Sequence, residues 1–387
     1  MLILPIPAQA APYTQFLLPD SEIVNSPCGT QFNLQDYVRS AGGKLSTYSQ
    51  YLNQQTLSGA DIVRLVEDEL SANPHFLLAF IEFRSQWVLG SRNAPDQTFP
   101  LELNISGLEG LYNELQTAAK LLNMGYYGWR GATMSDLAFP DGGSVPIAPA
   151  LNAGTVGLQY LFARIYPQAE WEAALYGPNG FLATYQKMFG DPLACARTVE
   201  PLFPDGLQLP TLELPFAPEE EWALTGGLHE DWNTGTPAGA LDFAPITGES
   251  HCAVSRAWVT ASAAGIITRS ENGALQEALV DAAGNPTGWA LLYLHVADQD
   301  RAAVGVHVNT DDRLGHPSCE GGVATGANVH LARLYRGEWI GAGDPFPYIL
   351  SGWLALPGLA PYQSNLVKGD KVVIAQPGAG GNSIIVR

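Results

Sequence analysis

Ala240-Leu241-Asp242-Phe243-Ala244 alternates apolar and polar side chains with the two-residue period of a β-strand. Leu241 and Phe243 then face one side of the strand, and Asp242, which has an alanine two residues away on either side, faces the other. A lone carboxylate among small residues on the open face of a strand is well placed to bind a ligand. The stretch therefore predicts a half-buried strand that carries a functional carboxylate.

More strands are expected beyond this one, because short alternating or β-branched runs follow it and are separated by glycines and prolines. These runs are Trp258–Thr260, Gly265–Thr268, Trp289–Val296, Asn328–Leu334 and Lys371–Ala375. We predict an antiparallel all-β domain over residues 219–345, followed by a C-terminal β extension over 346–387.

The first half of the chain shows helical periodicity instead. Ser58 is a plausible N-cap for a helix over Ile62–Leu70, and Asn73-Pro74 opens a second helix that continues to Leu89. Further helices are predicted over residues 108–123, 155–166 and 181–189. We predict an all-α accessory domain over residues 12–200, joined to the β domain by a proline-rich linker over 201–218.

Length and composition agree with this division. A chain of 387 residues suggests two or three folding units, and a hydrophobic content of 46% excludes wholesale disorder. The 19 basic and 38 acidic residues give a net charge of −19, which repels phosphate backbones, so no nucleic-acid partner is expected. No apolar run approaches the roughly 20 residues of a membrane helix, so no membrane span is predicted. Nothing in the sequence demands more than a monomer.

The four cysteines, at positions 28, 195, 252 and 319, favour an exported protein. None forms a C-x-x-C pair, which excludes the usual zinc-knuckle and thioredoxin spacings. Cys28–Cys195 and Cys252–Cys319 would each stay within one half of the chain, but three pairings are formally possible, and four buried free thiols are the alternative. Residues 1–11, with a small-x-small pattern, resemble the remnant of a secretory signal peptide.

Histidines concentrate in the β half, because five of the seven lie between residues 251 and 330. HExxH is absent, so any metal site has to be assembled from strands and not from one helix. Strand alternation places Asn328 and His330 on one face, and His295 ends another predicted strand. His229 precedes Asp242 by 13 residues, across a loop rich in glycine and proline.

Three ordered elements carry a family resemblance. The run from His229 to Phe243 resembles the His-to-Asp element of the lysostaphin/LytM/staphylolysin-type zinc metallo-endopeptidases, and its 13-residue spacing is most similar to the staphylolysin (beta-lytic) branch. LYLHVAD at 292–298 is similar to the family's Y-x-H element. GHPSCEGGVATGANVHLAR at 315–333 resembles its G-x-S…TG-x-H-x-H element. The resemblance covers roughly residues 222–340.

The resemblance implies a function and a set of site residues. His229, Asp242 and His330 would be the ligands of one catalytic Zn²⁺ per chain, leaving a fourth position for water. His295 would donate to the tetrahedral oxyanion or handle the proton. The implied protein is a secreted bacterial enzyme that cuts peptide cross-bridges of peptidoglycan or other glycine-rich peptides.

Asn328 departs from the family pattern. The family has a catalytic histidine two residues before the last ligand, and asparagine cannot take up a proton at neutral pH. Three interpretations remain open: an enzyme that relies on His295 or zinc-hydroxide alone, a naturally inactive zinc-binding relative that acts as a wall-binding or regulatory module, and a deliberate inactivating substitution. The first keeps Asn328 as a residue of the catalytic site.

Other polar residues have simpler interpretations. We expect His316 to stabilise a turn, His251 and His307 to be surface or turn residues, and His75 to have no metal partner. Residues 73–87 faintly resemble a transglycosylase helix, and Glu82 is the residue that a glycan-directed activity would use. We favour a structural or wall-binding role for the helical domain. Its aromatic residues could stack on sugars or pack in the core: Tyr126, Tyr127 and Trp129.

Overall fold

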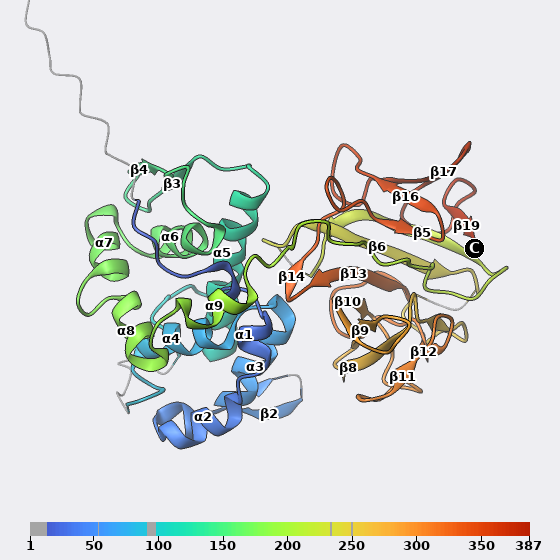
Figure 1. Cartoon of the computed structure of the whole chain (residues 1–387). Coiled ribbons are helices and arrows are strands. Elements are labelled where there is room, and N and C mark those ends of the chain that lie inside the picture. Colours follow the sequence, from blue (N-terminus) through green and yellow to red (C-terminus); the bar gives the residue numbers. More distant parts are fainter. Residues whose placement is uncertain (1–13, 53, 91–97, 233, 249–250) are drawn as a thin grey trace, which may run out of the picture. The chain divides into compact units, whose positions relative to one another are not determined.

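The computed structural model describes residues 14–52, 54–90, 98–232, 234–248 and 251–387. The chain divides into two compact units, Met1–Leu202 with Asn233–Thr236, and Phe203–Trp232 with Pro237–Arg387. Figure 1 shows the first unit as mostly helical and the second as mostly strands, each coloured along the sequence. The possible signal remnant over residues 1–11 lies outside the described residues.

Helices make up most of the first unit, as predicted. They are α1 (Pro27–Thr30), α2 (Leu34–Ala41), α3 (Gly59–Leu70), α4 (Pro74–Ser85), α5 (Leu111–Arg130), α6 (Ala153–Ile165), α7 (Gln168–Tyr176), α8 (Phe181–Phe189) and α9 (Leu193–Val199), with the 3₁₀ turns η1 (Asp20–Glu22) and η2 (Lys44–Thr47). Two short antiparallel hairpins, which the periodicity did not predict, accompany them: β1 (Ser49–Leu52) with β2 (Gln55–Ser58), and β3 (Asp136–Ala138) with β4 (Ser144–Pro146).

Local capping explains where the central helices begin. Ser58 is the N-cap of α3 and forms a capping box with Asp61. The side chain of Asn73 accepts a hydrogen bond from the backbone N–H of His75 at the start of α4. This helix ends at Ser85, four residues earlier than predicted, because Gln86 adopts a left-handed backbone conformation with φ of 56°.

The polar and aromatic residues singled out in this unit have structural roles. The carboxylate of Glu82 accepts hydrogen bonds from the backbone N–H groups of Val88 and Leu89 at 3.0 and 2.9 Å. Tyr126 and Tyr127 are buried in the core, and the indole N–H of Trp129 donates to the carbonyl of Leu151. Packing in the core and hydrogen bonds to the backbone that follows α4 therefore account for these side chains.

Strands build the second unit. They are β5 (Glu221–Glu230), β6 (Ala238–Pro245), β7 (Val259–Thr260), β8 (Gly265–Glu271), β9 (Ala274–Val280), β10 (Pro286–Leu294), β11 (His307–Val308), β12 (Arg313–Gly315), β13 (Val329–Tyr335), β14 (Glu338–Trp339), β15 (Ile349–Leu350), β16 (Trp353–Leu356), β17 (Asn365–Lys368), β18 (Lys371–Ile374) and β19 (Ile384–Val386). The main antiparallel sheet runs β11-β8-β9-β10-β13-β6-β5-β19, with β14 paired to β13 (Figure 1).

The alternation predicted for residues 240–244 is present in β6. Leu241 and Phe243 are fully buried in the core of the second unit, whereas the side chain of Asp242 on the opposite face keeps 19% of its exposure. A separate four-stranded sheet, β15-β16-β17-β18, covers part of the region expected to be a C-terminal β extension.

Most of the segment predicted to be a proline-rich linker over residues 201–218, from Phe203 onward, packs into the second unit. Leu212, Leu214 and Phe216 are buried in its hydrophobic core. The backbone N–H of Glu213 donates to Ser262, and Leu212 accepts from the backbone N–H of Ser351. This segment is extended, as its prolines suggest, but its apolar residues belong to the β core.

Both cysteine pairs are joined. Of the three pairings open from the sequence, the chain forms Cys28–Cys195 in the first unit and Cys252–Cys319 in the second. Among the described helices, none is long and apolar enough to cross a membrane.

A buried carboxyl group makes the second unit sensitive to pH. Glu277 on β9 accepts a hydrogen bond from the hydroxyl of Tyr293 at 2.8 Å, and burial raises the pKa of Glu277 from 4.5 to about 7. The folded state therefore holds this proton more tightly than the unfolded chain does. The contribution of this group to the free energy of unfolding is fully present below about pH 4.5 and decreases by up to roughly 3 kcal/mol as the pH rises from about 4.5 to about 7.

We expect Glu277→Gln to abolish this fall in stability, because the amide does not ionise. Urea unfolding of the second unit, measured at pH 5 and pH 8, tests the expectation. Glu219→Gln, at an exposed position of the same unit, is the matched control and should keep the wild-type pH dependence. A wild-type protein equally stable at both pH values would contradict the assignment.

Candidate metal centre

Four neighbouring strands bring the predicted site residues together. In the order β10-β13-β6-β5, His330 on β13 pairs directly with Asp242 on β6, and His229 on β5 pairs with Ala240 on β6. On its other side His330 pairs with Leu294, the last residue of β10, and His295 follows immediately. Residues that are about 100 positions apart in sequence therefore meet at one end of the sheet.

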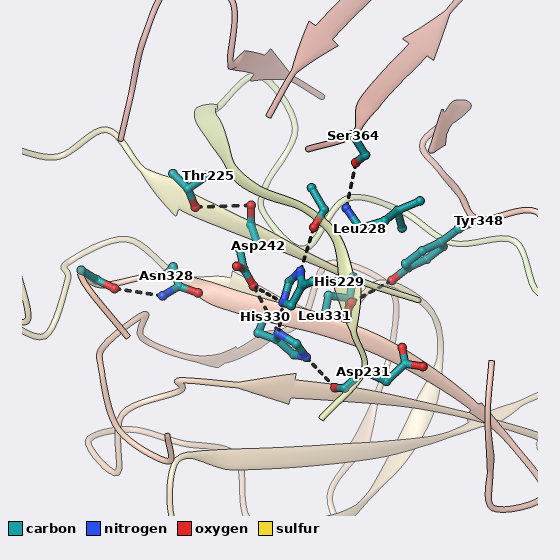
Figure 2. Close-up of polar contacts among 12 residues, drawn as sticks. Thr225, Leu228, His229, Asp231, Asp242, Asn328, His330, Leu331, Tyr348 and Ser364 are labelled. Carbon is teal, nitrogen blue, oxygen red and sulfur yellow. Dashed lines mark hydrogen bonds and ion pairs between the residues drawn. The ribbon is translucent and has the colours of Figure 1, made fainter. Parts of the chain in front are cut away.

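The side chains of His229, Asp242 and His330 converge on one point (Figure 2). Nε2 of His229 lies 3.0 Å from Nδ1 of His330, which lies 3.2 Å from Oδ1 of Asp242. Nε2 of His229 lies 3.4 Å from the same carboxylate oxygen. Both imidazoles are buried. Two nitrogen atoms and one oxygen atom thus form a compact triangle.

The outward nitrogen of each imidazole is held by a backbone carbonyl. Nδ1 of His229 lies 2.7 Å from the carbonyl oxygen of Gly227, and Nε2 of His330 lies 2.6 Å from that of Asp231. A carbonyl can only accept, so each of these nitrogens carries the proton and donates it. The other nitrogen of each ring is directed into the triangle, which is the arrangement that metal-binding histidines show.

The electrostatics keep these groups in metal-binding forms. Burial lowers the pKa of the His229 imidazole and so favours its neutral form. Burial raises the pKa of Asp242, but the hydrogen bond with His330 and the nearby imidazoles outweigh it, so the net pKa is lowered. A neutral imidazole and an ionised carboxylate are the species that bind a cation.

Two glycines of β5 make room for the site. A Cβ at Gly226 would lie 2.1 Å from Oδ2 of Asp242, and a Cβ at Gly227 would lie 2.3 Å from the backbone nitrogen of Ser364. Any larger residue at Gly226 would push the carboxylate out of the triangle. Gly227 lets the segment before β17 approach β5, where the hydroxyl of Ser364 accepts a hydrogen bond from the backbone N–H of Leu228.

His295 lies beside the triangle and not in it. Its ring centroid is 6.4 Å from that of His330, and the two rings are nearly perpendicular. Nδ1 of His295 donates to the carbonyl of Glu320 at 2.9 Å, and Nε2 has no hydrogen-bond partner among the residues that the structure describes. Burial lowers the pKa of His295. A neutral imidazole with a free Nε2 can accept a proton or, once protonated, donate one.

Asn328 lies next to the triangle, just before β13. Its Nδ2 donates to the carbonyl of Gly326 at 2.9 Å, and its buried Oδ1 has no hydrogen-bond partner among the described residues. Figure 2 shows this oxygen directed toward the side of His330 and Asp242. The residue therefore offers a hydrogen-bond acceptor at the site, in place of a group that exchanges protons.

Tyr362 is a site residue that the sequence did not indicate. Its ring stacks on His229 with centroids 4.2 Å apart and an interplanar angle of 19°, and its backbone exchanges hydrogen bonds with Gly227 and Leu228 on β5. Tyr362 lies in the loop between β16 and β17 and is half exposed. No spacing rule links it to His229, so only the fold places it there.

The remaining histidines lie outside the triangle. His316 is buried, donates to the carbonyl of Ala257 and packs against Trp258. His251 and His307 are exposed. His75 in the first unit pairs with Glu22. The second group of possible ligands among the described residues, Glu22 with Cys28 and Cys195, contains the two disulfide-bonded cysteines, which cannot act as thiolates.

Comparisons with known proteins agree with the two-part architecture. The LasA N-terminal domain family matches residues 16–201. Protease LasA of Pseudomonas aeruginosa strain PAO1 is 25% identical over 294 residues, which are 70% of this chain and 64% of that protein. Protease LasA of strain UCBPP-PA14 is 25% identical over 296 residues. The match thus spans less than two thirds of the length of these relatives.

Solved structures with some likeness include pseudoalterin, an M23 metalloprotease from the deep sea. It is 23% identical, with a TM-score of 0.36, over 43% of this chain and 96% of that one. The catalytic domain of lysostaphin from Staphylococcus simulans is 17% identical, with a TM-score of 0.22, over 32% and 88% of the two chains. These identities and TM-scores are too low to support an argument about the family or the function of this chain. The match to the LasA N-terminal domain family and the 25% identity to the curated proteases LasA support the resemblance of the chain to the lysostaphin/LytM/staphylolysin-type (beta-lytic) family.

Proposed function

We propose that the chain is a secreted zinc metallo-endopeptidase that hydrolyses peptide bonds in peptidoglycan cross-bridges, with glycine-rich peptides as the simplest substrates. The single observation that carries this proposal is the triangle of Nε2 of His229, Oδ1 of Asp242 and Nδ1 of His330. The similarity to the curated proteases LasA supports it.

The triangle fits zinc in size and in chemistry. Donor atoms about 2.0–2.2 Å from a tetrahedral zinc ion lie roughly 3.3–3.6 Å from one another, close to the observed edges of 3.0, 3.2 and 3.4 Å. Two imidazoles and one carboxylate are a usual donor set for catalytic zinc, and Gly226 leaves space that only the carboxylate fills. His229, Asp242 and His330 would hold the zinc, which would supply Lewis-acid activation of a water molecule and of the scissile carbonyl.

The residues around the triangle would handle protons and orientation. His295 presents its free Nε2 beside the site, so it can take a proton from the attacking water or donate to the developing oxyanion. Oδ1 of Asn328 can accept a hydrogen bond from a substrate N–H and so align the peptide. Tyr362 keeps the His229 ring in place by stacking and borders the site with an exposed hydroxyl-bearing ring.

Asn328 also supports a second candidate function, a zinc-binding relative that binds walls without cutting them. Nδ2 is engaged by Gly326, and the residue has no proton to exchange. Loss of a general base typically costs about 10²–10⁴-fold in rate. His295 favours the enzyme, because an oriented neutral imidazole beside the triangle has no evident structural use.

The disulfides and the net charge support a proposal for the location and the partner of the protein. Two disulfides are typical of proteins that work in oxidising compartments outside the cytoplasm. A net charge of −19 gives no electrostatic attraction to an anionic wall. We propose an extracellular monomer that recognises wall peptides through short-range contacts at the site.

Metal content is the first test. We expect purified protein to hold one zinc per chain and to cleave peptidoglycan peptides until a chelator removes the metal. His330→Ala removes one of the three donors and should abolish both zinc retention and cleavage, as measured by elemental analysis and peptide assay. His307→Ala, on an exposed strand, is the control and should behave as wild type. A zinc-free protein, or an unaffected His330→Ala variant, would refute the ligand assignment.

Gly226→Ala tests the space behind the carboxylate. The added methyl group displaces Asp242, so we expect zinc affinity to fall by about 10–100-fold, the scale of a disturbed ligand partner. Competition with a chromogenic chelator measures this affinity. Gly381→Ala meets nothing within 4 Å and is the matched control. Equal zinc affinity in both variants would contradict the geometry.

Asn328→His tests whether the site is catalytic. A histidine there restores a group that exchanges protons, and we expect the rate of wall lysis to rise by about 10²-fold. Asn328→Ala serves as control and should lie below the wild-type rate, because it lacks the amide acceptor. If neither the wild type nor Asn328→His lyses purified cell walls while both hold zinc, the binding-module function replaces the enzyme.

A further inference from the structure

His295 has a backbone conformation that needs support from outside its own strand. It follows the last residue of β10 with a φ of 66°, in the left-handed region that residues with a Cβ seldom adopt. The β10–β13 pairing ends at Leu294, so the regular sheet no longer holds the chain at His295. Other contacts must fix the direction of this imidazole.

One short segment, residues 318–320, supplies those contacts. The backbone N–H and the hydroxyl of Ser318 both donate to the carbonyl of His295, at 2.7 and 2.9 Å. The carbonyl of Glu320 accepts from Nδ1 of His295 at 2.9 Å. The segment also touches the other side of the site, because the backbone N–H of Asn328 donates to the carbonyl of Ser318.

Cys319 is the central residue of this segment, and its side chain is tied to Cys252. The segment belongs to the irregular connection between β12 and β13, where few ladder hydrogen bonds restrain the backbone. The partner loop is itself attached to the same connection: Ser255 donates to the carbonyl of Pro317, and the carbonyl of His251 accepts from Ala327. The disulfide thus closes a second loop onto the segment that orients His295.

We infer that the Cys252–Cys319 disulfide is a positioning crosslink for His295. It holds the carbonyl of Glu320 where Nδ1–H can reach it, which fixes the tautomer and keeps Nε2 as the proton-accepting nitrogen of the imidazole that lies beside the metal triangle. Opening the crosslink frees residues 318–320 and lets the imidazole rotate. This inference rests on the proposed function only for its effect on catalysis, since the orientation of the ring can be measured without a substrate.

The three proposed ligands do not depend on this crosslink. His229, Asp242 and His330 lie within strands that pair across the sheet, and their outer partners are the carbonyls of Gly227 and Asp231. Loss of the disulfide should therefore disturb His295 while zinc stays bound. A merely stabilising disulfide would show no such selectivity.

The experiment compares the full-length zinc-loaded protein with Cys252→Ser/Cys319→Ser. Nitrogen NMR of labelled histidines should show His295 as a single Nδ1–H tautomer in the wild type and as a mixture of tautomers in the double variant, with zinc still at one per chain. We expect kcat on a glycine-rich wall peptide to fall by about 10–100-fold with little change in KM. Cys28→Ser/Cys195→Ser, which opens the disulfide of the first unit, is the matched control and should leave the His295 tautomer unchanged.

Two further variants separate positioning from general loss of stability. Ser318→Ala keeps the crosslink but removes the hydroxyl that donates to His295, and should reproduce part of the fall in kcat. In a His295→Ala background, opening the disulfide should have no further effect on kcat, because the residue that it positions is gone.

The outcomes are distinct. An unchanged His295 tautomer in the double variant, loss of zinc together with activity, or equal losses of kcat with and without His295 would each overturn the inference. If the wild-type protein cleaves no peptide, the proposed function fails, while the tautomer comparison still decides whether the crosslink positions the ring.

Discussion

The pairing of β13 with β6 is the constraint on which the site depends. Leu331 pairs with Leu241 and Val329 with Phe243, all four buried, and this register sets His330 opposite Asp242 on the other face. A slip of one residue would turn the leucines outward and the ligands inward. The hydrophobic effect that fixes the register of the core therefore also assembles the polar triangle on the opposite face of the strands.

Much of this could be predicted from local patterns. Ser58 and Asn73 identify two helix starts because capping chemistry acts over three or four residues. The period-two alternation around Asp242 indicates which side chain leaves the core. The ordered family motifs named the residues that the fold brings together, His229, Asp242 and His330, with His295 beside them.

What the sequence did not reveal depends on contacts between distant segments. Tyr362 stacks on His229, 133 positions earlier in the sequence, and no periodicity encodes such a contact. The prolines of residues 201–218 suggest a linker, yet Leu214 and Phe216 are buried because the β core offers them apolar partners. One of the two hydrogen bonds from Ser318 to the carbonyl of His295 comes from its backbone N–H, a group that nearly every residue possesses and that therefore leaves no trace in the composition.

The pairing of β19 affects how the second unit folds. β19 pairs with β5, so that Ile385 lies opposite Trp222 on the strand that carries His229. Until β19 has paired with β5, one edge of β5 has unpaired backbone groups that can form hydrogen bonds with other chains. Completion of the sheet joins Trp222 to Ile385, which are 163 positions apart in sequence, and contacts of such long range form slowly. The strand that carries His229 therefore gains its second neighbour only after distant parts of the chain have met.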